Sequence, residues 1–181
     1  MTTFVALLRA VNVGSANRVR MADLRAAFLT AGYDDAVTHI QTGNVIFTTG
    51  ESQETTRRRI EQLIHDGLGL TITAIVRSAA ELCAVTTSNP FIAAASDPKQ
   101  LYVGFLSAAP SADAVKALDA MSFGDDAFEV VGREIFLRYA NGAGSTKLTN
   151  TVIEKKLGVH STSRNWNVTT KLAELAELAA G

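Results

Sequence analysis

The sequence predicts an α+β fold made of two β-α-β-β-α-β units in tandem. Short β-rich runs alternate with amphipathic helical patterns, in the same order in both halves of the chain. Two turn signals, Thr42-Gly43-Asn44 and Gly132-Arg133, each stand between a pair of strand-like runs. The length of 181 residues, of which 47 % are hydrophobic, is enough for one large domain or two small ones.

Residues 1–77 account for the first unit. A β-rich run over 3–9 is followed by a loop over 11–19 that is rich in Gly, Asn and Ser. Apolar residues then recur at helical spacing from Met21 until Gly32, a residue typical of a helix C-terminus. The remaining expected elements are strands over 37–41 and 45–49, a helix with its apolar stripe at Ile60, Leu63 and Ile64, and a strand over 71–76.

Residues 78–99 are expected to connect this unit to a second one, over 100–181, which ends in a further helix. The connecting helix begins at the capping-box pair Ser78 and Glu81 and ends before Asn89-Pro90. In the second half we expect strands over 101–106, 128–131, 135–139 and 159–163, and helices over 115–121, 147–157 and 168–179. Each half is then a split βαβ, or ferredoxin-like, unit. Because about 80 residues alone would have a marginal core, we expect the two units to pack as one body.

The composition narrows the classes of function. Basic and acidic residues number 17 and 18, so the net charge of −1 provides no global positive field for nucleic acid or for an anionic membrane. No apolar run is long enough to span a bilayer, and no targeting segment is recognisable, which predicts a cytoplasmic protein without a membrane partner. The sequence does not indicate an oligomeric state.

The sequence also predicts no metal site and no cofactor. His39, His65 and His160 lie at no metal-ligand spacing, and the common motifs for nucleophiles, zinc and phosphate loops are absent. The single cysteine, Cys83, excludes an intrachain disulfide. Its apolar neighbours predict a buried and inert thiol.

Uncharged polar and basic residues gather in four segments: the first loop, the tip of the first hairpin, residues 142–147 and residues 164–167. The last two precede predicted helices, whose free backbone N–H groups and macrodipole favour an anion. The candidate ligand-binding residues are Arg9, Asn12, Gln41, Asn44, Ser145, Lys147, Asn150, Arg164, Asn165, Trp166 and Asn167. We expect Lys147 and Arg164 to approach one common anion, because a short strand after Gly158 would return the chain to the start of the preceding helix.

Each of these segments also has a purely structural interpretation, because Gly, Ser, Thr and Asn are ordinary turn and cap residues. The run Arg57-Arg58-Arg59 is better explained as a solvated helix face than as a nucleic-acid patch, since Glu54 and Glu61 flank it. Residues 101–106 resemble the first RNA-contacting strand of an RNA-recognition motif, but residues 132–139 lack the pattern that the partner strand requires.

Seven segments, spread over the whole chain, are jointly specific. They are Arg9-Ala10-Val11-Asn12-Val13-Gly14, Met21-Ala22-Asp23-Leu24, Gln41-Thr42-Gly43-Asn44-Val45, Val76-Arg77-Ser78, Asn89-Pro90-Phe91, Ser145-Thr146-Lys147-Leu148-Thr149-Asn150 and Arg164-Asn165-Trp166-Asn167. At these segments the chain resembles a bacterial family of uncharacterised proteins, domain-of-unknown-function family 1697. The resemblance implies tandem ferredoxin-like (α-β plait) subdomains, and it implies no activity and no catalytic residue.

Three functions remain open. The first is a binding module for a phosphorylated or other anionic ligand, which would be a nucleotide or a nucleic acid. It is favoured because basic and amide groups collect locally while the net charge stays at −1. The second is an enzyme that acts on a phosphorylated small molecule without a metal or a covalent nucleophile, with Lys147 or Arg164 stabilising charge. The third is a structural or protein-interaction domain.

Overall fold

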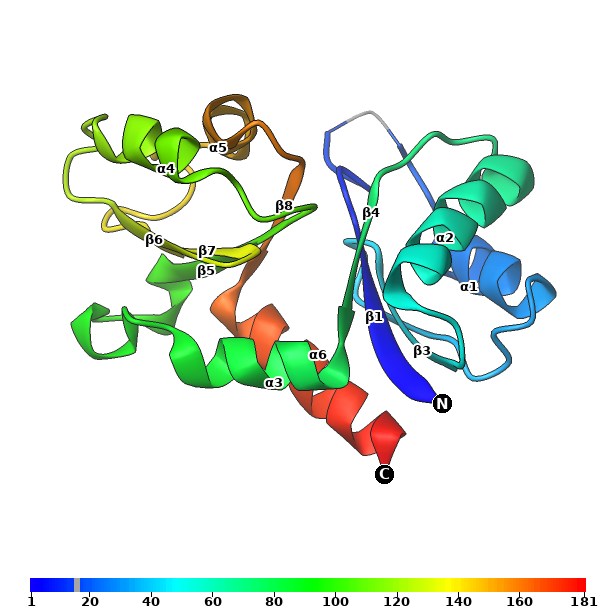
Figure 1. Cartoon of the computed structure of the whole chain (residues 1–181). Helices are drawn as coiled ribbons and strands as arrows, with labels where there is room; N and C mark the ends of the chain where they lie inside the picture. The colour runs from blue at the N-terminus through cyan, green and yellow to red at the C-terminus, as the bar shows by residue number, and fades with distance from the viewer. Residues whose placement is uncertain (15–16) are drawn as a thin grey trace. The chain divides into compact units, whose positions relative to one another are not determined.

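The computed structural model describes residues 1–14 and 17–181. Its elements form two four-stranded antiparallel sheets and six α-helices among the described residues, so the predicted α+β class is confirmed (Figure 1). The chain divides into two compact units, Met1–Ala84 with Lys171–Gly181, and Val85–Thr170. None of the helices in the described part of the chain combines the length and apolarity that crossing a bilayer requires.

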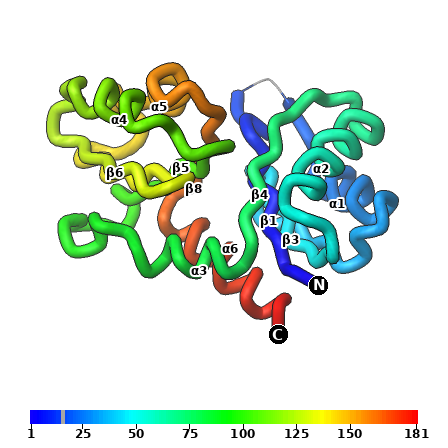
Figure 2. Tube along the Cα trace, viewed as in Figure 1, coloured from blue at the N-terminus to red at the C-terminus, as the bar shows by residue number. Residues whose placement is uncertain are grey.

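The first sheet has the strand order β2-β3-β1-β4. Its unit contains β1 (Thr2–Leu8), α1 (Met21–Thr30), β2 (Val37–His39), β3 (Asn44–Thr49), α2 (Gln53–Leu68) and β4 (Ala74–Ser78), which Figure 2 traces in this order. Alternate residues of β1, Phe4, Ala6 and Leu8, face a core that includes Phe28 of α1 and Ile60 of α2. This period of two is that of a strand with one face against helices.

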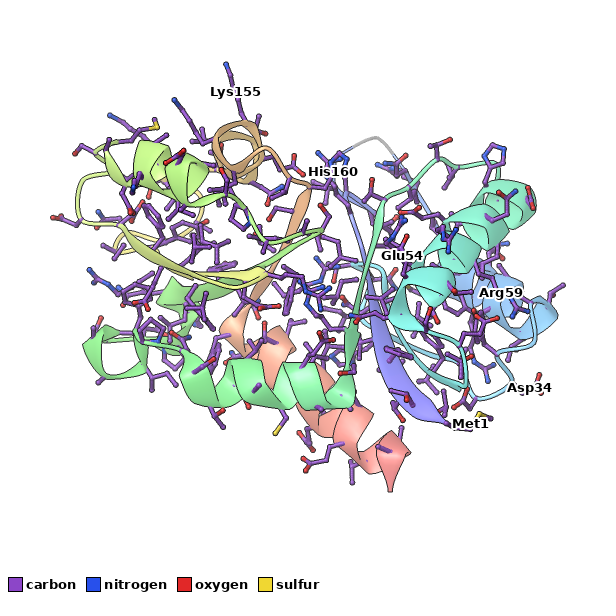
Figure 3. The ribbon with its side chains drawn as sticks, in the orientation of Figure 1. Met1, Asp34, Glu54, Arg59, Lys155 and His160 are labelled. Carbon is purple, nitrogen blue, oxygen red and sulfur yellow. The ribbon has the colours of Figure 1, made fainter. Side chains whose placement is uncertain are left out.

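The ends of α2 follow from local sequence. Ser52 caps the helix, with its hydroxyl oxygen accepting from Thr55 N at 3.3 Å, and Gly69 ends it in the left-handed conformation at φ +66°. On the outer face, Arg57 contacts both Glu54 and Glu61 at 2.7 Å. Figure 3 labels Glu54 on this helix. The predicted solvated face is therefore confirmed.

The second sheet has the strand order β6-β7-β5-β8. Its elements are β5 (Leu101–Leu106), α4 (Ala112–Asp119), β6 (Ala127–Val131), β7 (Glu134–Arg138), α5 (Asn150–Leu157) and β8 (Ser161–Asn165). The helices α3 (Ala79–Ser88) and α6 (Trp166–Ala180) follow the last strand of each sheet, and two short 3-10 turns, Ile92–Ala94 and Pro98–Gln100, precede β5.

Some boundaries differ from the predicted ones. The helix expected over 147–157 begins at Asn150, because Thr149 caps it and Thr146 accepts the backbone N–H of Leu148 at 2.9 Å, which holds that stretch in a turn. The strand expected over 159–163 is shifted to Ser161–Asn165. The final helix begins at Trp166, two residues early, since the Asn165 side chain accepts from Val168 N at 2.9 Å.

Cys83 is exposed on α3, so the prediction of a buried thiol is wrong. Leu82 and Val85 are the buried residues of this turn, at 0 % and 4 % exposed. Residues three apart share a helix face, whereas Cys83 is rotated by about 100° from Leu82. Apolar neighbours in sequence therefore do not imply burial on a helix.

The two sheets share one hydrogen-bond register. Val5 pairs with Ile46 and Arg77 in the first sheet, and Val103 pairs with Phe136 and Arg164 in the second. Both arginines are buried, at 1 % and 7 % exposed. Each donates from its Nη1 to the carbonyl of the preceding residue, at 3.0 and 2.9 Å. The two units thus share a backbone framework although their amino-acid sequences differ.

The correspondence between the two sheets continues three residues further along β1 and β5. Leu8 N donates to Gly43 O at 2.8 Å, and Leu106 N donates to Arg133 O at 2.8 Å. In both sheets this bond joins the end of the central strand to the turn of the neighbouring hairpin. The units can therefore be compared loop by loop.

His39, at the end of β2, should make the protein sensitive to acid. Burial lowers the pKa of its imidazole, and the charge of Lys171 lowers this pKa further. The unfolded chain therefore binds this proton more tightly, so the free energy of unfolding should fall as the pH drops from about 7 to 5. His39→Gln should reduce that fall, measured by urea unfolding at both pH values. An equal fall in the variant and the parent would contradict this assignment.

Candidate functional site

A cleft of about 370 Å³ opens in the first unit, between the loop that joins β1 to α1 and the turn that joins β2 to β3. It is lined by Asn12, Gly14, Arg18, Val19, Arg20 and Gln41. Asn12 and Gln41 are predicted ligand-binding residues from two separate segments, and the structure brings them together. Its volume lies at the lower end of the range for small-molecule sites.

Asn12 holds the walls of the cleft in place. Its Nδ2 donates to Val19 O at 2.9 Å and to Gln41 O at 2.8 Å, and its Oδ1 accepts from Val19 N at 2.9 Å. Both amide hydrogens are thus used within the protein. The Asn12 side chain therefore shapes the cleft and has no hydrogen left to donate to a ligand.

The backbone around the cleft adopts left-handed conformations at several residues other than glycine. The residues are Ala10, Asn12, Asn17 and Ile40, with φ between +50° and +56°. Asparagine tolerates this region, whereas a β-branched residue such as Ile40 is a true outlier. Such strain collects at functional sites, so it marks this part of the chain as a candidate.

Gly43 closes the turn against β1 and also has a positive φ, of +71°. A Cβ at this position would lie 3.0 Å from the Cβ atoms of Leu8 and Val11. Only glycine therefore fits both the backbone conformation and the space. Through this contact the turn reaches the end of β1, beside the cleft.

The cationic groups of the cleft differ in their partners. Arg20 is paired with Asp23 through two bonds, Nε to Oδ2 at 2.7 Å and Nη2 to Oδ1 at 2.9 Å, and this pairing raises the pKa of Arg20. Arg18 is exposed and has no hydrogen bond or ion pair with any residue that the structure describes. Its guanidinium therefore remains available to an external anion.

The corresponding part of the second unit lacks this loop. Residues 9–20 join β1 to α1, whereas only residues 107–111 join β5 to α4. The shorter connection is held down by Ser107, whose N–H donates to His160 O at 2.9 Å and whose Oγ accepts from His160 N at 3.1 Å. The two units share one backbone framework, but only the first has the longer loop that shapes the cleft. Loops on a rigid scaffold are the usual place for binding residues.

Two other predicted residues of the first unit have structural contacts. The Asn44 side chain is fully buried, and its Nδ2 donates to His39 O at 3.1 Å and to Thr42 Oγ1 at 3.0 Å. Arg9 continues the pairing of β1, with its backbone N–H donating to Thr73 O at 3.0 Å. Asn44 thus stabilises the hairpin turn, and Arg9 lies at the end of the sheet nearest the cleft loop.

The glycine-rich segment of the second unit forms a turn and not a helix N-terminus. Ser145 Oγ donates to Asn141 O at 3.0 Å and to Gly142 O at 3.2 Å, and Thr146 Oγ1 donates to Asp126 Oδ2 at 2.5 Å. Lys147 is exposed and makes no hydrogen bond or ion pair with the described residues. The hydroxyl groups expected to face an anion are used to order the turn.

The remaining predicted residues border the ends of α5 and α6. Asn150 Nδ2 donates to Ser161 O at 3.0 Å, which attaches the first turn of α5 to β8. Asn165 caps α6, Trp166 is half-buried in its first turn, and Asn167 is exposed beside it. These contacts are structural ones, as the capping interpretation of the sequence states.

The contacts of Arg164 do not support the predicted common anion of Lys147 and Arg164. Ser163 Oγ donates to Asn150 Oδ1 at 3.4 Å, so Ser163 faces α5 and the next residue, Arg164, projects from the opposite face of the sheet. There its Nη1 donates to Thr162 Oγ1 at 2.8 Å, and burial lowers the pKa of its guanidinium to about 10. Lys147 lies in the exposed turn that leads into α5.

Arg18, Arg20 and Gly14 line the cleft but are not among the predicted ligand-binding residues. The available signal was their membership of the same polar loop as Asn12. Arg18 is the unpaired cation of this loop among the described residues because Arg20 forms an ion pair with Asp23. That pair is only one of several that the sequence allows.

Comparison with known proteins gives a family and a fold. A family model described as "Protein of unknown function (DUF1697)" matches residues 1–136, which confirms the resemblance noted from the sequence. Among solved structures, the chain is similar to the conserved bacterial protein SP0830 from Streptococcus pneumoniae, with a TM-score of 0.78 and 21 % identity over 97 % of this chain and 98 % of that chain. At this identity the likeness concerns the fold alone. No curated protein matches the sequence.

Proposed function

Because the chain belongs to the DUF1697 family, whose description names no activity, we propose a function from the site itself: the cleft of the first unit binds a phosphorylated or other anionic ligand. The observation that carries the proposal is the exposed Arg18, which lines the cleft without a partner among the described residues. A guanidinium binds phosphate or carboxylate through two parallel bonds.

The surroundings of Arg18 support an anion in this position. Arg20 lines the same cleft, but the carboxylate of Asp23 offsets its charge, so Arg18 supplies the positive potential of the lining. The net charge of −1 makes a local site more plausible than a broad electrostatic surface. Asn12 joins Val19 to Gln41, which fixes these two walls of the cleft before a ligand binds and lowers the entropic cost of binding.

The strand order also bears on the class of each unit. Two helices on one face of an antiparallel sheet ordered 2-3-1-4 is what a split βαβ unit forms. We therefore propose that each unit is ferredoxin-like.

Arg18→Ala should weaken anion binding about tenfold or more, because it removes a charge-assisted contact. Isothermal titration calorimetry with inorganic phosphate and ribose 5-phosphate measures the effect, and raised salt should weaken binding further. Arg58→Ala is the matched control, since it removes the same charge from an exposed site on α2, away from the cleft. Equal weakening in both variants, or no binding by the parent protein, would contradict the proposed site.

A further inference from the structure

The polar groups that remain available in the cleft differ in chemistry. Arg18 offers a cation with a fork of N–H donors. Gln41 also lines the cleft, and its exposed side-chain amide has no partner among the described residues; only its backbone carbonyl is used, by Asn12. An amide presents a donor and an acceptor side by side, which an anion alone does not need.

Two exposed aliphatic side chains adjoin these groups in the chain. Val13 stands between the lining residues Asn12 and Gly14 and is 65 % exposed. Ile40 directly precedes Gln41 and is 44 % exposed, although its left-handed φ of +50° would suit glycine or asparagine better. An apolar side chain retained in a strained and exposed position suggests contact with an apolar surface of a ligand.

We infer that the ligand of this cleft is a nucleoside monophosphate, an inference that rests on the anion site proposed above. The phosphate matches the one unpaired arginine of the cleft among the described residues, and the base edge matches the paired donor and acceptor of Gln41. Val13 and Ile40 neighbour lining residues in the chain without lining the cleft, and they are the exposed aliphatic side chains that the inference assigns to the face of the base. A single nucleotide also suits a cleft of about 370 Å³ better than a nucleic-acid strand does, since a strand requires several phosphate contacts.

Calorimetry on the full chain tests this inference. The ligands are inorganic phosphate, ribose 5-phosphate, the four ribonucleoside monophosphates, the corresponding nucleosides and an eight-residue oligonucleotide. We expect at least one monophosphate to bind about tenfold or more tightly than ribose 5-phosphate. Gln41→Ala should remove most of that gain while leaving ribose 5-phosphate binding unchanged, whereas Arg18→Ala should weaken both.

A second variant separates ligand contact from folding. Ile40→Asn introduces a residue that tolerates the left-handed conformation, so the midpoint of thermal unfolding should not fall. The extra affinity for a monophosphate over ribose 5-phosphate should decrease. A lower midpoint of thermal unfolding with an unchanged affinity ratio would show that Ile40 has only a structural role and does not contact the base.

The possible failures are distinguishable. If ribose 5-phosphate and every monophosphate bind equally, the nucleotide inference is overturned while the anion site stands. If nucleosides bind as well as monophosphates, or no phosphorylated compound binds, the anion site itself fails. If the oligonucleotide binds more tightly than its eight residues account for as independent monophosphates, the ligand is a nucleic-acid strand and the inference is overturned.

Discussion

Asn12→Ala is expected to lower the free energy of unfolding by about 2–4 kcal/mol. The change removes three hydrogen bonds, each contributing about 1 kcal/mol, and leaves the backbone N–H of the buried Val19 without its acceptor. It also places alanine at φ +55°, which costs about 1 kcal/mol more than asparagine does. Urea unfolding at neutral pH measures the loss.

Two variants isolate the cause of this loss. Gln41→Ala should cost less than about 0.5 kcal/mol, because Gln41 contributes its backbone carbonyl and not its side chain to the bond with Asn12. Asn12→Gly removes the same hydrogen bonds but tolerates the backbone conformation. If Asn12→Ala were no more destabilising than Gln41→Ala, the side chain of Asn12 would not be what holds the loop.

Gly43→Ala should lower the free energy of unfolding by about 2–5 kcal/mol. The left-handed backbone costs an alanine about 1–2 kcal/mol. In addition, the new Cβ would lie 3.0 Å from the Cβ atoms of Leu8 and Val11, which are buried and cannot move away freely, so overpacking adds about 1–3 kcal/mol. The same unfolding experiment measures the sum.

The second unit offers a matched control for Gly43. Gly132 stands in the turn between β6 and β7 at φ +60°, and nothing lies within 4 Å of a Cβ built there. Gly132→Ala should therefore cost only the conformational part, about 1–2 kcal/mol. Similar losses for both variants would mean that the close approach to β1 adds nothing to the requirement for glycine.

The order of strands and helices was predictable because it depends on local periodicity. Met21 to Gly32 and Ile60 to Ile64 carry helical patterns that the packed structure retains. The face that Arg164 occupies was not predictable, because a shift of one residue in the register of β8 would turn it to the side of α5. The exposure of Cys83 was also not predictable, because it depends on which side of α3 faces solvent.

The candidate site was predictable in part for a similar reason. The polar loop and the hairpin turn could each be recognised from composition, and Asn12 and Gln41 were named in them. Their contact depends on a hydrogen bond between residues 29 positions apart, which no local pattern encodes. The pairing of Arg20 with Asp23, which leaves Arg18 as the available cation, follows from side-chain conformations in the folded loop.

The register that the two sheets have in common gives each backbone position of one central strand a counterpart in the other. The counterparts include Val5 and Val103, each with an arginine opposite it on the edge strand. The units differ in the connection between their first strand and first helix, which is longer in the first unit. Grafting residues 9–20 in place of 107–111 would therefore transplant the cleft loop onto a scaffold whose strand ends already match.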